Sequence, residues 1–158
     1  MGVLTQREGT TVISVESSVL IDRHIDDAWA FVSNPRNEAV WHSDILEVRR
    51  TAPGSESAES WMPGEEFYVT VQFIGRKEYA AEITGFEKGR RLEFTTKEGP
   101  FRPIATYVLE PVAGATRFTR HVVMPTPGLL RLMTPLMRRE LAKRNARFAQ
   151  NLKKLLEQ

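Results

Sequence analysis

Residues 127–157 have the sequence PGLLRLMTPLMRRELAKRNARFAQNLKKLLE. At 3.6 residues per turn, the large apolar side chains of this segment fall on one stripe, formed by Leu130, Met133, Met137, Leu141, Phe148, Leu152 and Leu155. The pattern predicts one long amphipathic helix at the C-terminal end, which Pro135 could interrupt. Because one side of this helix is apolar, it has to be buried against another layer of the domain.

The layer available to cover this helix is a series of alternating strands. Two strands are predicted at residues 11–21 and 45–51, with two short helices between them in residues 22–44. From Glu66 onward, five more alternating runs follow one another across hairpin-length turns, which predicts an antiparallel meander. The expected order is β-α-α-β-β-β-β-β-β-α, an α+β fold with a seven-stranded antiparallel sheet.

Length and composition predict one domain over residues 1–158, with 41% apolar and 27% charged residues. The chain has no cysteine, which excludes disulfides and thiolate metal sites. The first residues lack the apolar core of a signal peptide, and no segment is apolar enough to span a bilayer. We therefore expect a cytoplasmic protein.

The net charge of +2 is unevenly distributed. Residues 128–158 contain eight Lys or Arg and two Glu, a net charge of +6, so the rest of the chain carries −4. This basic surface is either a solvated helix face or a site for a membrane or an acidic partner. Few aromatic residues lie between the basic ones, so we do not expect nucleic-acid binding.

A seven-stranded antiparallel sheet twists and curls, and it is wider than one helix of about 10 Å diameter. The interior is therefore either a filled core or a cavity beneath the helix, and the pattern leaves both open. For the cavity, we expect inward strand residues, the helix methionines and Trp41 to bind the ligand. This ligand-binding set is Trp41, Phe67, Val69, Val71, Tyr79, Ala81, Phe94, Tyr107, Phe118, Arg120, Met133, Met137 and Leu141.

Polar groups on these inward faces are the candidates for chemistry. Arg120 shares a strand face with Phe118, so its guanidinium either forms a structural contact or binds a carboxylate or enolate oxygen of a ligand. Tyr79, Tyr107 and His42 could move protons, although His42 could equally be a surface histidine. The three histidines show no metal-ligand spacing, and no cofactor motif is present. No catalytic, metal or cofactor residue is assigned.

Several short motifs resemble those of a known family. They are SSVLI at 17–21, IDDAWAFV at 25–32, NP at 34–35, PG at 63–64, PF at 100–101, YVLEP at 107–111 and GATRFT at 114–119. Together with Trp41 and the leucine-rich C-terminal segment, they resemble the polyketide cyclase/dehydrase family of the START/birch-pollen-allergen-like (SRPBCC) superfamily. The resemblance implies a helix-grip fold, in which a curled sheet wraps around a long C-terminal helix and encloses a cavity for sterols, lipids or polyketides. The usual Ala-Pro pair before the first helix is Arg23-His24 here, which changes a surface turn.

Three functions follow as hypotheses. The preferred one is binding of a hydrophobic small molecule, such as a lipid, polyketide or aromatic compound, between sheet and helix. The first alternative is a polyketide cyclase or dehydratase that acts by acid-base catalysis in the same cavity. The second is an interaction module that uses the basic C-terminal helix on a protein or membrane. We expect a monomer or a homodimer.

Overall fold

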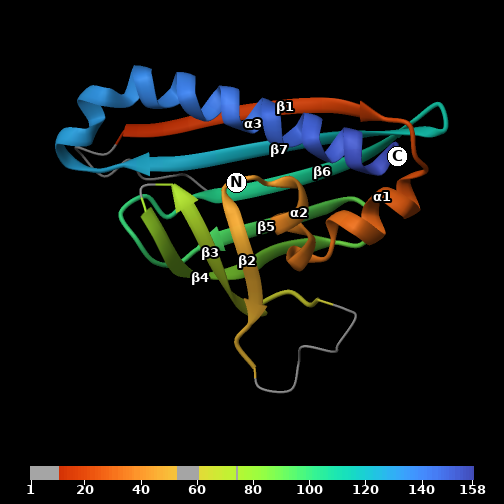
Figure 1. The fold of residues 1–158 in the computed structure, drawn as a ribbon, viewed down its shortest axis with the longest axis horizontal. Helices are drawn as coiled ribbons and strands as arrows, with labels where there is room; N and C mark the ends of the chain where they lie inside the picture. Colours follow the sequence, from red (N-terminus) through yellow and green to blue (C-terminus); the bar gives the residue numbers. More distant parts are fainter. Residues whose placement is uncertain (1–10, 53–60, 74) are drawn as a thin grey trace.

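The computed structural model describes residues 11–52, 61–73 and 75–158, and it has the predicted α+β architecture (Figure 1). The strands are β1 (Thr11–Ile21), β2 (Ile45–Arg50), β3 (Glu66–Phe73), β4 (Gly75–Glu87), β5 (Arg91–Thr96), β6 (Ile104–Val112) and β7 (Ala115–Thr126). The helices are α1 (Ile25–Val32), α2 (Glu38–Trp41) and α3 (Thr134–Leu156), with 3₁₀ helices η1 (Pro35–Asn37) and η2 (Gly128–Met133). The predicted order of strands and α-helices is confirmed.

All seven strands form one antiparallel sheet in the order β1-β7-β6-β5-β4-β3-β2. The strands from β2 to β7 pair with their neighbours in sequence. Strand β1 lies at the edge of the sheet and pairs with β7 along its whole length. The register shifts once between Ile45 and Glu47 and once between Ile83 and Gly85. Such irregularities increase the local twist, and Figure 1 shows β2 and β3 crossing at a steep angle to β1. The sheet is therefore curled.

Helix α3 runs alongside β1 (Figure 1). It begins at Thr134, with Pro135 in its first turn, and residues 128–133 form a separate 3₁₀ helix, so the segment is interrupted next to Pro135, as the sequence allowed, and is not one continuous helix. Proline has no N–H to donate and therefore fits the first turn of a helix but not its interior. Phe148 and Leu152 are buried as expected, whereas Leu130 and Met133 on η2 are exposed.

The end of the sheet near α1 and α2 is filled by aromatic side chains. The ring of Trp41 packs edge-on against Tyr107 at 5.6 Å and Phe118 at 5.9 Å between centroids. The amide of Asn151 on α3 donates a hydrogen bond to the carbonyl of Trp41 at 3.2 Å, which joins α3 to α2. This half of the interior is a packed core, so any hollow has to lie toward the other end of α3.

Within the described ranges, none of the helices combines the length and the hydropathy needed to cross a bilayer. Exposed large apolar side chains gather on η2 and the first turn of α3, namely Leu129, Leu130, Leu132, Met133 and Leu136. Arg131, Arg138 and Arg139 lie in the same stretch and are also exposed. Docking of this surface on a partner or membrane stays a prediction.

Candidate functional site

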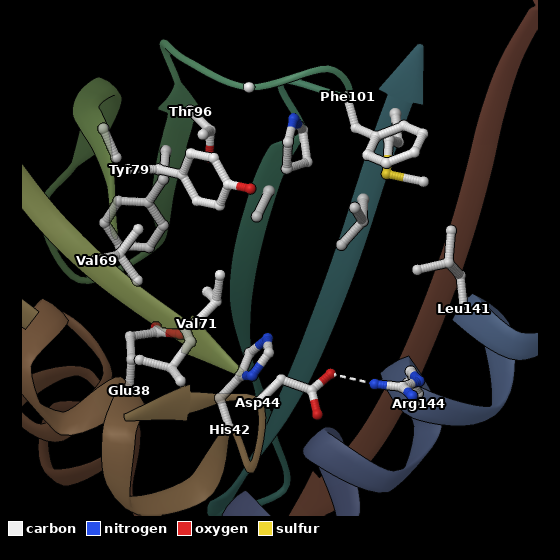
Figure 2. Close-up of a pocket in the computed structure, with 18 of the residues that line it drawn as sticks. Glu38, His42, Asp44, Val69, Val71, Tyr79, Thr96, Phe101, Leu141 and Arg144 are labelled. Carbon is white, nitrogen blue, oxygen red and sulfur yellow. Dashed lines mark hydrogen bonds and ion pairs between the residues drawn. The ribbon is translucent and has the colours of Figure 1, made fainter. Parts of the chain in front are cut away.

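A cavity of about 580 Å³ lies between the inner face of the sheet, α3 and the segment that joins β5 to β6. Its walls are mostly apolar, and its volume is within the usual range for small-molecule sites. Figure 2 shows Glu38, His42, Asp44 and Arg144 at one end, and Tyr79, Thr96 and Phe101 at the other. Of the two alternatives for the interior, the structure therefore has the cavity.

Ten of the thirteen residues predicted to bind the ligand line this cavity, and the other three do not. The ten are Phe67, Val69, Val71, Tyr79, Ala81, Phe94, Tyr107, Arg120, Met137 and Leu141. Trp41 and Phe118 belong to the packed core instead, because they fill the end of the interior beside α1. Met133 lies on η2 and is half exposed, because α3 begins only after it. Contact between the ten residues and a ligand stays a prediction.

The segment between β5 and β6, which contains none of the predicted site residues, also lines the cavity. Gly99 has a φ of +85°, and a Cβ built there would lie 2.8 Å from Cε1 of Tyr79. Only glycine allows both this backbone conformation and this close approach. Gly99 thus lets the segment pack directly against the Tyr79 ring, with Phe101 further along the wall.

The polar end of the cavity contains Arg120, which is only 7% exposed. Its Nη1 donates a hydrogen bond to Oδ1 of Asn145 on α3, and its Nη2 lies 3.1 Å from Nε2 of His42. The amide of Asn145 donates in turn to the backbone carbonyl of Arg120 at 3.0 Å. The predicted inward orientation of Arg120 is confirmed, and a helix residue holds it in place.

His42 is not a surface histidine, so that alternative is wrong. Its ring stacks on Phe148 with 3.8 Å between centroids, because His42 directly follows Trp41 where α3 crosses α2. Arginine has no acceptor atom, so Nε2 of His42 accepts the hydrogen bond and Nδ1 carries the proton. Burial and the charge of Arg120 hold the pKa of His42 well below its usual value, so the ring is neutral.

Glu38, which was not among the predicted site residues, completes the polar end. The hydroxyl of Tyr107 donates a hydrogen bond to its Oε2 at 2.8 Å. Burial raises the pKa of Glu38 to about 7, although the charge of Arg120 and this hydrogen bond oppose the shift. Burial and the Glu38 charge also raise the pKa of Tyr107 well above its usual value. Near neutral pH, Glu38 is therefore the group of this cluster that exchanges a proton.

Three buried atoms at this end have no hydrogen-bond partner among the described residues. They are Oε1 of Glu38, Nδ1 of His42 and Nε of Arg120. All three residues line the cavity, and buried polar atoms in proteins are nearly always paired. These atoms are enclosed by neighbouring side chains, so a bound molecule could reach the cluster only through other atoms of these residues.

A second pair lies beside this cluster. Nη1 of Arg144 is 2.6 Å from Oδ2 of Asp44, and both side chains are partly buried (Figure 2). This ion pair joins α3 to the residue before β2. It neutralises Arg144, so the net charge of the polar end depends on Arg120 and on the protonation state of Glu38.

Comparison with known proteins agrees with this architecture. The family model described as polyketide cyclase / dehydrase and lipid transport matches residues 12–157. No curated protein matches the sequence at a significant level. Three solved structures illustrate the similarity, and at 10–13% identity they support the fold alone.

A START superfamily protein from Mycobacterium smegmatis has a TM-score of 0.71 and 12% identity, with 91% of this chain and 97% of that chain covered. The protein TTHA0849 from Thermus thermophilus has a TM-score of 0.72 and 13% identity, with 90% and 96% covered. The di-domain ARO/CYC StfQ from the steffimycin biosynthetic pathway has a TM-score of 0.69 and 10% identity, with 92% of this chain and 51% of that chain covered. These matches confirm the helix-grip fold.

Proposed function

Because the chain belongs to the polyketide cyclase / dehydrase and lipid transport family, we propose that it binds an apolar small molecule with one polar end in the cavity beneath α3. Membership of this family and the structural neighbours support either hydrophobic ligand binding or a polyketide cyclase-type function. The observation that carries the proposal is the cavity of about 580 Å³, whose buried polar cluster is confined to one end.

The binding free energy favours a ligand that has both an apolar part and a polar end. Burial of about 300 Å² of apolar ligand surface corresponds to about 7 kcal/mol at 25 cal/mol per Å². Association itself costs a comparable amount. Tight binding therefore also requires hydrogen bonds between the ligand and the polar residues that line the cavity, Glu38, His42 and Arg120.

A substitution that fills the cavity tests this proposal. Val71 lines the cavity on β3, whereas the next residue, Gln72, is exposed on the opposite face of the strand. Val71→Trp is expected to weaken binding of the fluorescent apolar probe N-phenyl-1-naphthylamine by about 10-fold or more, because a new indole would occupy the ligand's space. Gln72→Trp is the matched control and is expected to bind the probe like the wild type.

Circular dichroism would show whether both variants are folded. A folded Val71→Trp variant with wild-type affinity would place the probe outside the cavity and contradict the proposal. Native mass spectrometry of the wild type with the probe gives the stoichiometry, which is expected to be one.

A second candidate function, acid-base catalysis of polyketide cyclisation or dehydration, is favoured by one observation. Three of the four residues predicted for this role lie together with Glu38 at one end of the cavity. They are Arg120, His42 and Tyr107. Tyr79, the fourth candidate, lies at the other end (Figure 2). Glu38 could move a proton while the donors of Arg120 and His42 stabilise an enolate oxygen.

The enzyme candidate predicts turnover, whereas a carrier returns its ligand unchanged. With a linear poly-β-ketone thioester, an enzyme is expected to form ring products faster than the spontaneous reaction. Glu38→Gln is then expected to lower that rate by about 100-fold, the usual contribution of a general acid or base. Product analysis by liquid chromatography and mass spectrometry would show the difference. Product formation at the spontaneous rate would contradict catalysis of this substrate class.

A further inference from the structure

The polar end of the cavity holds a buried positive charge whose hydrogen bonds go to neutral groups. Arg120 donates to the amide oxygen of Asn145 and to the neutral ring of His42, and no carboxylate in the described part of the chain forms an ion pair with it. A buried charge without a counterion costs several kcal/mol. The site therefore favours an anion that enters from the cavity.

The polar groups at this end of the cavity indicate which kind of anion would bind there. Nδ1 of His42 carries its proton, and Nε of Arg120 always does, so both are donors without acceptors among the described residues. Hydrogen bonds from a guanidinium to an anionic oxygen are among the strongest in proteins. A guanidinium and an imidazole that line a mostly apolar cavity suit a carboxylate or an enolate oxygen.

The remaining charges around Glu38 decide its protonation state when such an anion binds. Tyr107 on β6 donates to Oε2, Arg120 on β7 is positive, His42 after α2 is neutral, and Arg144 on α3 is paired with Asp44. If Glu38 stayed ionised, two negative groups would share one guanidinium. A protonated Glu38 removes that repulsion.

We propose that the cavity selects molecules whose apolar body ends in an anionic oxygen group, a carboxylate or an enolate, and that Glu38 takes up one proton from solvent when such a molecule binds. The inference rests on the proposed function, because it specifies the polar end of the ligand held in the same cavity. Fatty acids and aromatic polyketides can both supply this chemistry.

Isothermal titration calorimetry with matched ligand pairs tests the inference. The aliphatic pair is decanoate and 1-decanol, and the aromatic pair is 2-naphthoate and 2-naphthylmethanol. At pH 8, a carboxylate that binds is expected to do so with uptake of about 0.9 proton, because nearly all of Glu38 is ionised in the free protein at this pH. The uptake is measured from the difference in binding heat between phosphate and Tris buffers. Between pH 7.5 and 8.5 its affinity is expected to fall about eightfold, whereas the alcohol shows neither effect.

Glu38→Gln keeps the size of the side chain and removes its proton exchange. In this variant, carboxylate binding is expected to take up no proton and to keep the same affinity from pH 7.5 to 8.5. Proton uptake that persists in Glu38→Gln would overturn the assignment to Glu38. The measurements on the wild type test the inference even where the variant does not fold.

The ligand pairs also separate this inference from the proposed function. Equal affinity for a carboxylate and its alcohol, without proton uptake, would overturn the inference and leave apolar binding intact. Failure of all four compounds to bind would contradict the proposed function itself. Binding of decanoate but not naphthoate would support a fatty-acid ligand, and the reverse would support an aromatic one.

Discussion

Phe118→Ala is expected to lower the free energy of unfolding by about 3–5 kcal/mol, the usual cost of removing a buried aromatic ring. Phe118 is fully buried on β7, and its ring lies 5.4 Å from Tyr107 and 5.9 Å from Trp41 between centroids. Because these rings belong to the packed half of the interior, the space left behind could close only partly. The substitution is therefore expected to lower the stability of the folded protein.

Urea denaturation monitored by circular dichroism would measure this loss, with Phe118→Leu as the conservative control that keeps most of the apolar volume. The leucine variant is expected to lose less stability than the alanine variant. Both are expected to keep the probe affinity of the wild type while folded, because Phe118 does not line the cavity. A folded Phe118→Ala variant that fails to bind the probe would indicate that Phe118 contacts the ligand after all.

Glu38→Gln is expected to raise the free energy of unfolding at pH 8 by about 3 kcal/mol. The folded protein raises the pKa of Glu38 from 4.5 to about 7, so the folded state binds the proton more tightly than the unfolded state. The stability from this group is fully present below pH 4.5 and is lost as the pH rises through about 7. A shift of roughly 2.5 pKa units corresponds to about 3 kcal/mol.

The measurement is the difference in unfolding free energy between wild type and variant from pH 4.5 to pH 8. The difference is expected to be small at the acidic limit and to grow in favour of Glu38→Gln as the pH rises. Glu110→Gln is the control, because Glu110 is an exposed carboxylate on β6, the same strand as Tyr107. A wild type that becomes more stable than Glu38→Gln at pH 8 would mean that Arg120 stabilises an ionised Glu38.

Much of the site could have been predicted from sequence, and Glu38 shows why part of it was missed. Glu38, Trp41 and His42 have the spacing of neighbours on one helix face, and Trp41 was already expected to bind the ligand. That spacing could have predicted that Glu38 lies beside Trp41 and His42. Nothing local in the sequence pairs His42 with Phe148, because these residues meet only where α3 crosses α2.

The alternation of the strands and the 3.6-residue stripe of residues 137–155 were enough to predict the curled sheet and the helix against it, because both patterns report which side of an element is apolar. The same patterns could not distinguish a packed residue such as Phe118 from a cavity residue such as Phe94, because both are apolar and point inward. That difference depends on how side chains from distant elements fill the space beneath α3. The proton affinity of Glu38 likewise depends on burial and on Arg120, which the folded chain alone brings near it.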